Sequence, residues 1–372
     1  MSSNAAEVVI VGGGIAGIST AYYLAKAGVA STVIEKNAIG SHASGFAYGG
    51  LGALGGPGIP GPAYQLAAEG MRLHRELAAD LAKSTDINIE FREWPTLSLE
   101  FSQEDAETAK DAVAWQQEQP GYSARWMDPQ DVRSVDDRIS DAVLGGVYVD
   151  GTLDVDPYRL MLALTQSAEA AGVTVRHGTV TGLKSRGGKV KGVVLEYEEV
   201  PAENVVLAMG PWGAEASSWI GQVTPVTPLK GQILRMRVPG PPVQVSIGWE
   251  GNYATTKPDG LLWAGTTEEE AGFDETLTTG ARDSIMAKLL KMLPSLGDAQ
   301  LVRQTACLRP LSADRLPILG RVPNIEGVYV ATGGGRKGIV FGPAMGRTIA
   351  DLITHGTSVL PIEAFSLGRF AR

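Results

Sequence analysis

A glycine-rich turn between a short apolar strand and a helix constrains the fold of this chain more than any other feature. Residues 8–11 (VVIV) have the composition of a buried parallel strand. The pattern G-x-G-x-x-G follows at once and is completed by Gly12, Gly14 and Gly17. Apolar residues recur at helical spacing over 18–27, and residues 31–34 predict a second strand. The segment therefore predicts a β-turn-α-β unit of the kind that binds dinucleotides.

Each glycine of this turn has a physical role. Gly12 allows the tight turn, Gly14 lets the backbone approach a pyrophosphate, and Gly17 lets the helix pack closely on the strand. Backbone N–H groups are exposed where the predicted helix starts. Because the positive end of the helix dipole lies at the same place, the turn favours binding of phosphate.

An acidic residue follows at the position that a bound adenosine requires. Glu35 comes directly after the second predicted strand, where a carboxylate accepts hydrogen bonds from the ribose. An acid there favours a free 2′-hydroxyl, so the pattern indicates NAD or FAD rather than NADP. The alternative is an ordinary glycine-rich turn without a ligand. The strand, the helix and Glu35 together favour dinucleotide binding.

Length and composition bound the remaining choices. The 372 residues are enough for two hydrophobic cores, so we expect two domains. The net charge of −9 argues against nucleic acid or an anionic membrane as the main partner. Cys307 is the only cysteine, which fits a reducing, cytoplasmic compartment. The four histidines show no pairing typical of a metal site. No apolar run approaches the roughly 18 residues of a transmembrane helix.

Two later segments repeat the pattern of strand, glycine and helix. Residues 205–209 form an apolar strand before Gly210, and residues 327–332 precede a glycine loop and a predicted helix. The region 223–265 between them is rich in strand patterns. The sequence therefore predicts an α/β fold with a Rossmann-like, parallel-sheet nucleotide domain and an inserted, mostly antiparallel α+β substrate domain.

The pattern places the domain boundaries in loops and makes both domains discontinuous. The predicted nucleotide domain comprises residues 1–85, 140–220 and 300–372, and the substrate domain comprises 86–139 and 221–299. A loop rich in Gly, Ala and Ser, residues 37–62, follows Glu35. Such small residues let the backbone pass close to a large flat ligand; the alternative is a mobile surface linker.

Several motifs in order resemble the D-amino-acid oxidase family of flavoenzymes, in its glycine oxidase and sarcosine oxidase branch. The resemblance covers nearly the whole chain. It rests on VVIVGGGIAGISTAYYLAKAG…VIEK, VVLAMGPW, TPVTPLKGQ, NYATTKPDG, CLRPLSADRLPILG and VATGGGRKGIVFGPAMG. The resemblance implies FAD rather than NAD as the cofactor.

The family pattern also implies which residues contact FAD. Gly12, Gly14 and Gly17, with Ile15 and Ala16 between them, would hold the pyrophosphate, and Glu35 and Lys36 the adenosine. The residues implied near the flavin are Ser44, Tyr48, Gly49, Gly50 and Leu51. Val180 would contact the adenine, with Gly210 and Trp212 nearby. The residues implied at the pyrimidine edge of the isoalloxazine are Gly333, Gly334, Gly335, Arg336, Gly338 and Ile339.

Three residues match family positions that contact the substrate. Arg309, in Cys-Leu-Arg-Pro, matches the arginine that binds the substrate carboxylate, and a guanidinium suits this role because its two parallel N–H donors match two carboxylate oxygens. Tyr253 matches a tyrosine that often joins it, and Lys337 a carboxylate-binding lysine of sarcosine oxidases. The alternatives are that Arg309 pairs with Asp314, that Tyr253 is a core residue and that Lys337 is solvated.

Two departures from the family pattern bear on the cofactor and the substrate. Gly334 stands where the C-terminal glycine loop commonly has histidine, and Ala47 stands where covalently flavinylated relatives carry their attachment residue. We therefore expect non-covalent FAD, although His42 is close by. The order of residues in GGPGIPGP is unlike the family pattern and leaves the substrate open.

The resemblance implies an FAD-dependent amino-acid or amine oxidoreductase acting on CH–NH or CH–NH₂ groups. The substrate would be a D-amino acid, glycine or a secondary amino acid; hydride transfer to flavin N5 would give an imine that hydrolyses. Oxygen or a quinone would be the final acceptor, and the oligomeric state is open. One alternative is an NAD-dependent dehydrogenase, which the separated glycine loops argue against. Another is a non-catalytic FAD-bound subunit of a heteromeric amine dehydrogenase.

Overall fold

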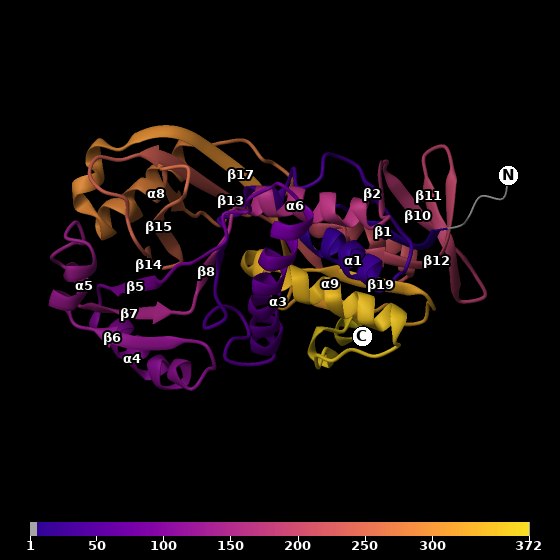
Figure 1. Cartoon of the computed structure of the whole chain (residues 1–372), viewed down its shortest axis with the longest axis horizontal. Helices are drawn as coiled ribbons and strands as arrows, with labels where there is room; N and C mark the ends of the chain where they lie inside the picture. Colours follow the sequence, from indigo (N-terminus) through magenta and orange to yellow (C-terminus); the bar gives the residue numbers. More distant parts are fainter. Residues whose placement is uncertain (1–5, 372) are drawn as a thin grey trace.

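The computed structural model describes residues 6–371, and Figure 1 shows an elongated molecule with one large sheet towards each end. Within the described residues, no helix is long and apolar enough to cross a membrane. No cluster of three or more His, Cys, Asp or Glu side chains in that range is placed to hold a metal ion.

The first sheet is built on parallel pairing of strands that are far apart in the sequence. Its central strand β1 (Ala6–Val11) lies between β2 (Ser31–Glu35) and β12 (Glu199–Leu207). β9 (Thr174–His177) pairs with β2, and β19 (Val328–Thr332) pairs with β12, both parallel. The β-branched residues at the centre of this sheet, from Val8 to Val11 in β1, Val205 and Val206 in β12, and Val328 and Val330 in β19, are buried, as expected for a parallel sheet.

Antiparallel strands extend this sheet at the β12 side. β18 (Ile318–Arg321) pairs with β19, and β11 (Lys189–Leu195) pairs with β12 and with β10 (Val180–Arg186). The turn between β10 and β11 falls at Gly187 and Gly188, both with positive φ, as two-residue hairpin turns require.

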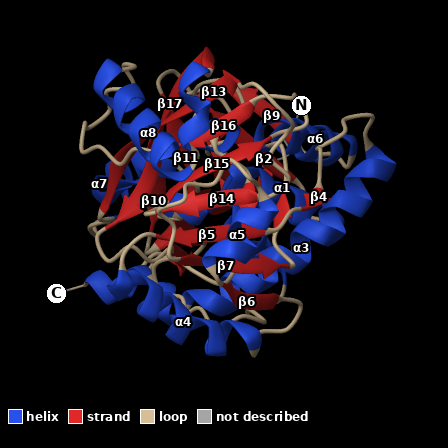
Figure 2. Cartoon of the chain, turned by 90° about the vertical axis from the view of Figure 1, so that its left-hand side faces the viewer, coloured by secondary structure: helices blue, strands red, loops and turns tan. Residues whose placement is uncertain are grey.

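The second sheet is antiparallel apart from one pair. Its strands, in spatial order, are β17 (Gln300–Ser312), β13 (Val226–Arg237), β16 (Leu262–Gly265), β15 (Asn252–Thr256), β14 (Ser246–Trp249), β5 (Thr96–Glu100), β7 (Gly145–Asp150) and β6 (Ser123–Met127). Only β14 and β5 pair in parallel. Figure 2 shows β14, β5, β7 and β6 as neighbouring strands.

A small third sheet connects the glycine-rich loop to the second sheet. It consists of β3 (Gly50–Leu51), β8 (Leu153–Asp154) and β4 (Arg92–Glu93). β8 pairs antiparallel with both of its neighbours. The loop is therefore hydrogen-bonded into the fold, and the alternative of a mobile linker is wrong for this part of it.

Four helices pack beside the first sheet and form its largest core. They are α1 (Ile15–Lys26), α3 (Ala63–Ser84), α6 (Pro157–Ala170) and α9 (Gly338–Thr354), which Figure 1 shows gathered beside β1. The apolar faces of these helices are buried against one another and against the strands.

Five further α-helices occur in the described residues. They are α2 (Ala43–Phe46), α4 (Gln103–Gln117), α5 (Pro129–Val135), α7 (Ser217–Ile220) and α8 (Thr279–Met292). 3₁₀ helices occur at Gly210–Ala216, Pro294–Asp298, Gly335–Lys337, Glu363–Phe365 and Leu367–Phe370. α8 packs on the second sheet through Ile285 and Leu289.

The predicted fold class is confirmed, because a Rossmann-like parallel sheet and a mostly antiparallel sheet are both present. The first helix begins at Ile15, three residues before the predicted start, because Gly14 is its N-cap. We propose that each large sheet, with the helices on it, forms one of the two domains. β7 and β17 pair within the second sheet, so the proposal assigns them to the substrate domain rather than to the predicted segments 140–220 and 300–372.

The contact between α1 and α9 gives a stability prediction. A Cβ on Gly346 would lie 2.5 Å from the Cβ of Ser19 and 2.6 Å from the backbone nitrogen of Thr20. We expect Gly346→Ala to lower the free energy of unfolding by about 1–3 kcal/mol, the range for overpacking, despite the better helix propensity of alanine. The midpoint of thermal unfolding measures this. Gly280→Ala, in the first turn of α8 with no neighbour within 4 Å, is the matched control and should not destabilise.

Candidate active site

A cavity of about 970 Å³ lies between the two large sheets. One wall is formed by the turn after β1, the glycine-rich loop and the loop before α9. The opposite wall comes from β13, β14, β15 and β17 of the second sheet. Residues from both predicted domains therefore face the same enclosed space.

The turn after β1 can be formed only by glycine at two positions. Gly12 has φ +108°, and a Cβ there would lie 2.4 Å from the carbonyl oxygen of Ala208. A Cβ on Gly17 would lie 2.0 Å from the carbonyl oxygen of Gly12. The close approach of α1 to β1 and β12 thus requires both glycines, as the motif predicts.

The start of α1 presents backbone donors to the cavity. Glu35 Oε2 accepts a hydrogen bond from the backbone N–H of Gly13 at 2.6 Å, and Ser44 Oγ accepts one from Ile15 at 3.0 Å. The N–H groups of Gly14 and Ala16 have no acceptor among residues 6–371, and both residues line the cavity. Free donors at a positive helix end suit a phosphate group, so this part of the cavity fits a dinucleotide.

At the predicted adenosine end of the site, a lysine ammonium and a histidine ring both contact the indole of Trp212. The Lys36 ammonium lies 3.6 Å from the centre of the Trp212 ring, and the His42 ring meets the same indole edge-on at 4.7 Å. These three residues line the cavity close to Glu35. Ala47, at the position of a covalent attachment residue in relatives, also lines the cavity but has no nucleophilic atom.

Arg309 faces the cavity from β17 without a carboxylate partner. Its Nη2 donates to Thr266 Oγ1 at 2.6 Å and its Nη1 to the carbonyl oxygen of Thr267 at 3.1 Å. No carboxylate in the described part of the chain lies within 4.0 Å of it. Asp314 instead pairs with Arg369 at 2.8 Å, so the alternative that Arg309 pairs with Asp314 is wrong.

Tyr253 lines the cavity and is also buried, with 9% of its surface exposed. Its ring stacks on Tyr48, with centroids 3.8 Å apart, and the Tyr48 hydroxyl donates to Ser246 Oγ at 2.6 Å. The Tyr253 hydroxyl has no hydrogen-bond partner among the described residues. Burial raises the pKa of Tyr253 well above its usual value, so the hydroxyl is a proton donor at neutral pH.

Lys337 is half-buried and hydrogen-bonded to the protein, so the alternative of a solvated lysine is wrong. Its Nζ donates to the carbonyl oxygen of Gly52 at 2.8 Å. A Cβ on Gly56 would lie 2.8 Å from Lys337 Cε, so the glycine-rich loop passes directly over this side chain. Burial, with a smaller contribution from the positive charge of Arg336, lowers the pKa of Lys337 to about 8.

Most of the residues predicted from the sequence meet at this cavity. Those that line it are Gly12, Gly14, Ile15, Ala16, Glu35, Lys36, Ser44, Tyr48, Gly50, Leu51, Val180, Gly210, Trp212, Tyr253, Arg309, Gly334, Gly335, Arg336, Lys337, Gly338 and Ile339. Gly17, Gly49 and Gly333 lie behind the wall. Gly49 and Gly333 have φ of +87° and +74°, so they shape the turns rather than contact the cavity.

Several cavity residues were not predicted from the sequence. Thr266 and Ser246 are the most informative, because they accept hydrogen bonds from Arg309 and Tyr48. Trp94 and Trp249 also line the wall. None of these residues belongs to a glycine loop or carries a charge, and no local pattern marks them. Only the pairing of distant strands brings them to the site.

Comparison with known proteins places this chain among flavoenzymes. A family model described as FAD dependent oxidoreductase matches residues 7–352. Glycine oxidase of Geobacillus kaustophilus is 30% identical over 369 residues, covering 98% of this chain and 97% of that protein. Glycine oxidase of Pseudomonas aeruginosa is 31% identical over 351 residues, covering 94% of each. The crystal structure of the Geobacillus kaustophilus glycine oxidase superposes with a TM-score of 0.92 at 29% identity, covering 98% of both chains.

The contacts of Glu35 give a prediction for cofactor affinity. We expect Glu35→Ala to weaken FAD binding about tenfold to a hundredfold, because the mutant loses the hydrogen bonds of a charged carboxylate, worth roughly 1.5–3 kcal/mol. Titration of the apoprotein with FAD measures the change. The exposed Asp298→Ala is the control. Unchanged affinity in Glu35→Ala would contradict the role of this residue at the ribose.

Proposed function

This chain belongs to the family of FAD-dependent oxidoreductases, and we propose on that basis that it oxidises the C–N bond of a small amino acid. The substrate class is glycine, a D-amino acid or a secondary amino acid. The similarity to glycine oxidases supports a small amino-acid substrate. Because these relatives are oxidases, we take oxygen as the final acceptor, with hydrogen peroxide, an oxo acid and an amine or ammonia as products.

The single observation that carries this proposal is the Arg309 guanidinium at the cavity wall. A buried or half-buried cation normally has an anionic partner, and none is present among the described residues. The two N–H groups already bonded to Thr266 and Thr267 leave three donors of the guanidinium free. We assign these donors to the substrate carboxylate, for which a planar fork is well suited.

Tyr253 and Lys337 are the other polar groups that we assign to the substrate side. A Cβ on Gly265 would lie 2.8 Å from the Tyr253 hydroxyl, and the next residue, Thr266, holds Arg309. The unpaired hydroxyl and the guanidinium therefore meet at the same segment. A protonated Tyr253 donates a hydrogen bond to the carboxylate, and Lys337 supplies a positive charge on the side of the glycine-rich loop.

The chain contributes orientation and exclusion of water rather than acid–base catalysis. Bound FAD supplies the hydride acceptor for this chemistry. Arg309 and Tyr253 fix the carboxylate, so that the carbon–hydrogen bond next to nitrogen is held towards the cofactor site. The nitrogen lone pair then forms the C=N bond of an imine as hydride leaves, and water hydrolyses the imine to the oxo acid. None of the four histidines is required for these reaction steps.

We expect FAD to be bound without a covalent link. Ala47 cannot form such a link, and the nearby His42 ring is engaged against Trp212. Precipitating the purified protein with acid should therefore release the flavin into the supernatant, where its absorption is measured. A yellow pellet would contradict this expectation and would make His42→Ala the next variant to examine.

Substitution of Arg309 tests the proposed function. We expect Arg309→Leu to retain FAD but to lower the efficiency of anaerobic flavin reduction by glycine or N-methylglycine by about 30-fold to several thousandfold. That range corresponds to roughly 2–5 kcal/mol, the cost of removing one partner of a buried charged pair. Arg309→Lys should recover only part of the loss, because an ammonium does not form a fork.

The control for this experiment is Arg303→Leu. Arg303 lies on the same strand, but its side chain is exposed and does not line the cavity. It should reduce its flavin as efficiently as the wild type. If Arg309→Leu does so as well, the carboxylate binds elsewhere and the proposed role of Arg309 is wrong.

A further inference from the structure

The guanidinium of Arg309 lies on a strand position that only glycine can occupy. β13 pairs with β17, with Leu229 opposite Arg309 and Gly231 opposite Cys307. A Cβ on Gly231 would lie 2.1 Å from Arg309 Nη2 and 2.3 Å from both Cζ and Nη1. The whole planar group therefore rests on the bare backbone of Gly231. No other side chain fits this position while Arg309 keeps its place.

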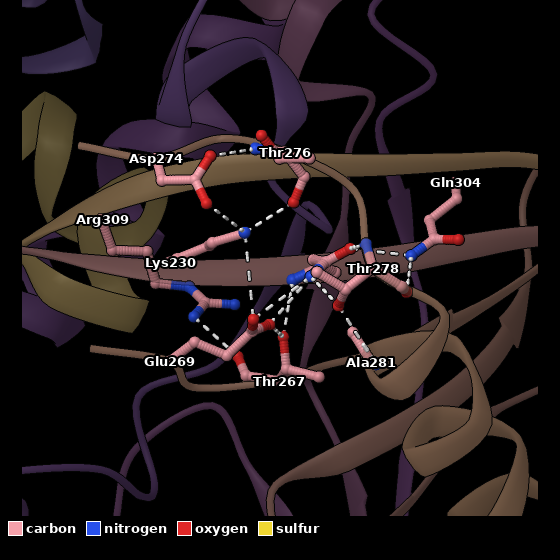
Figure 3. A network of polar contacts seen from close by, with 10 residues as sticks. Lys230, Thr267, Glu269, Asp274, Thr276, Thr278, Ala281, Gln304 and Arg309 are labelled. Carbon is pink, nitrogen blue, oxygen red and sulfur yellow. Dashed lines mark hydrogen bonds and ion pairs between the residues drawn. The ribbon is translucent and has the colours of Figure 1, made fainter. Parts of the chain in front are cut away.

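The two neighbours of Gly231 point to the opposite face of the strand, as strand alternation requires. Lys230 is 1% exposed, and its Nζ donates to the carbonyl oxygen of Thr276 at 2.5 Å. Asp274 and Glu269 lie 3.8 and 3.9 Å from this ammonium. Lys230 thus fixes the segment 267–278 on the back of β13, as Figure 3 shows.

Gln232 fixes the same segment closer to the arginine. Its backbone N–H donates to Thr267 Oγ1 at 3.0 Å, and its carbonyl oxygen accepts from Thr266 Oγ1 at 3.0 Å. Its side-chain amide donates to Glu269 at 3.0 Å, and Glu269 in turn accepts from Thr267 Oγ1 at 2.5 Å. The two atoms that accept hydrogen bonds from Arg309 belong to Thr266 and Thr267, so Gln232 determines where both acceptors lie.

We propose that Lys230, Gly231 and Gln232, together with Thr266, form an arginine seat that positions Arg309 for the substrate carboxylate. Gly231 provides the flat surface under the guanidinium, while Lys230 and Gln232 hold the acceptors at its edge. The seat touches Arg309 rather than the substrate, so its members are positioning residues. This inference rests on the proposed function, in which Arg309 binds the carboxylate.

The seat also explains why a lysine is buried without a close carboxylate contact. An ammonium has three donors, and Lys230 donates one hydrogen bond to a backbone carbonyl oxygen. Its positive charge lies within 4.0 Å of the carboxylates of Glu269 and Asp274. Glu269, which binds Thr267, is one of these acids. The position of Thr267 is therefore coupled to the charge of Lys230 through a single carboxylate.

Gly231→Ala is the first test, with the holoenzyme titrated with sodium acetate and binding followed by the flavin absorption spectrum. The methyl group must displace the guanidinium, so we expect acetate affinity to fall about tenfold to a hundredfold, the loss expected for a hydrogen bond to a charged group. FAD content should stay at the wild-type level. Gly182→Ala is the matched control, because it is also a strand glycine and its Cβ would meet nothing closer than 3.9 Å.

A double-mutant cycle decides whether Gly231 acts through Arg309. In an Arg309→Leu background, Gly231→Ala should change acetate affinity by less than about twofold, because the group it displaces is gone. An equal loss in both backgrounds would overturn the seat, and so would wild-type acetate affinity in Gly231→Ala. If Arg309→Leu alone leaves acetate binding unchanged, the proposed function fails and the inference fails with it. That result is distinguishable from failure of the seat alone.

Thr266 supplies an independent test in case Gly231→Ala does not fold. Thr266→Val keeps the shape of the side chain but removes the acceptor at 2.6 Å from Arg309 Nη2. Thr266→Ser keeps the hydroxyl. We expect acetate affinity to fall about tenfold in the valine variant and to stay near the wild-type value in the serine variant. Equal affinities in the two variants would overturn the role of the hydroxyl in positioning Arg309.

Discussion

Parallel pairing of three strands from distant parts of the chain is the constraint on which the site depends. Leu207 of β12 lies opposite Val11 of β1 on one side and Val330 of β19 on the other. Because parallel strands end at the same edge of a sheet, the glycine turns that follow the three strands gather there. Thr332 Oγ1 donates to the carbonyl oxygen of Gly210 at 2.9 Å, which ties two of these turns together. The cavity begins at this edge, and every other part of the site is placed relative to it.

The second sheet is fixed to this edge by buried contacts through the small sheet. Gly50 of the glycine-rich loop lies opposite Asp154 in β8, and Asp154 is 1% exposed. Its carboxylate pairs with Lys257, which follows β15, and with Arg92 at 3.0 Å. Removing one member of a buried pair leaves an uncompensated charge, at a cost of about 3–5 kcal/mol. The glycine loop and the wall that carries Tyr253 are therefore held in a fixed relation.

The sequence predicted those parts of the site that depend on local pattern. The turn at Gly12, the acid at Glu35 and the glycine loop before α9 each lie within a few residues of the strand that positions them. Arg309 was found from its motif, but the alternative partner Asp314 was suggested by nearness in the sequence. The chain turns after Ser312, and Asp314 pairs with Arg369, which lies far away in sequence. The prediction that Asp314 pairs with Arg309 was wrong because nearness in sequence does not determine which side chains meet in the folded chain.

Parts of the site that depend on contacts between distant residues could not be predicted in this way. The stack of Tyr48 on Tyr253 joins residues from the glycine loop and the second sheet, and no spacing in the sequence relates them. Thr266 and Gly231 are a similar case, since each contacts the Arg309 guanidinium from a distant part of the sequence. The motif Lys-Gly-Gln was visible in the sequence. The role that we propose for it could be inferred only from the register of β13 against β17, which places Gly231 next to Arg309.

The electrostatics of the cavity differ from those of the whole chain. The net charge is −9, yet acidic and basic side chains are balanced along the cavity wall, which is lined by Glu35, Glu100, Glu215 and Glu250 and by Lys36, Arg309, Arg336 and Lys337. Surface charges are screened by solvent, whereas fixed donors on a cavity wall act on a ligand with less screening. Burial lowers the pKa of Lys337 to about 8 and raises that of Tyr253, so desolvation works against charge on both groups. Neither group offers the planar fork of Arg309, whose parallel N–H donors match the two oxygens of a carboxylate.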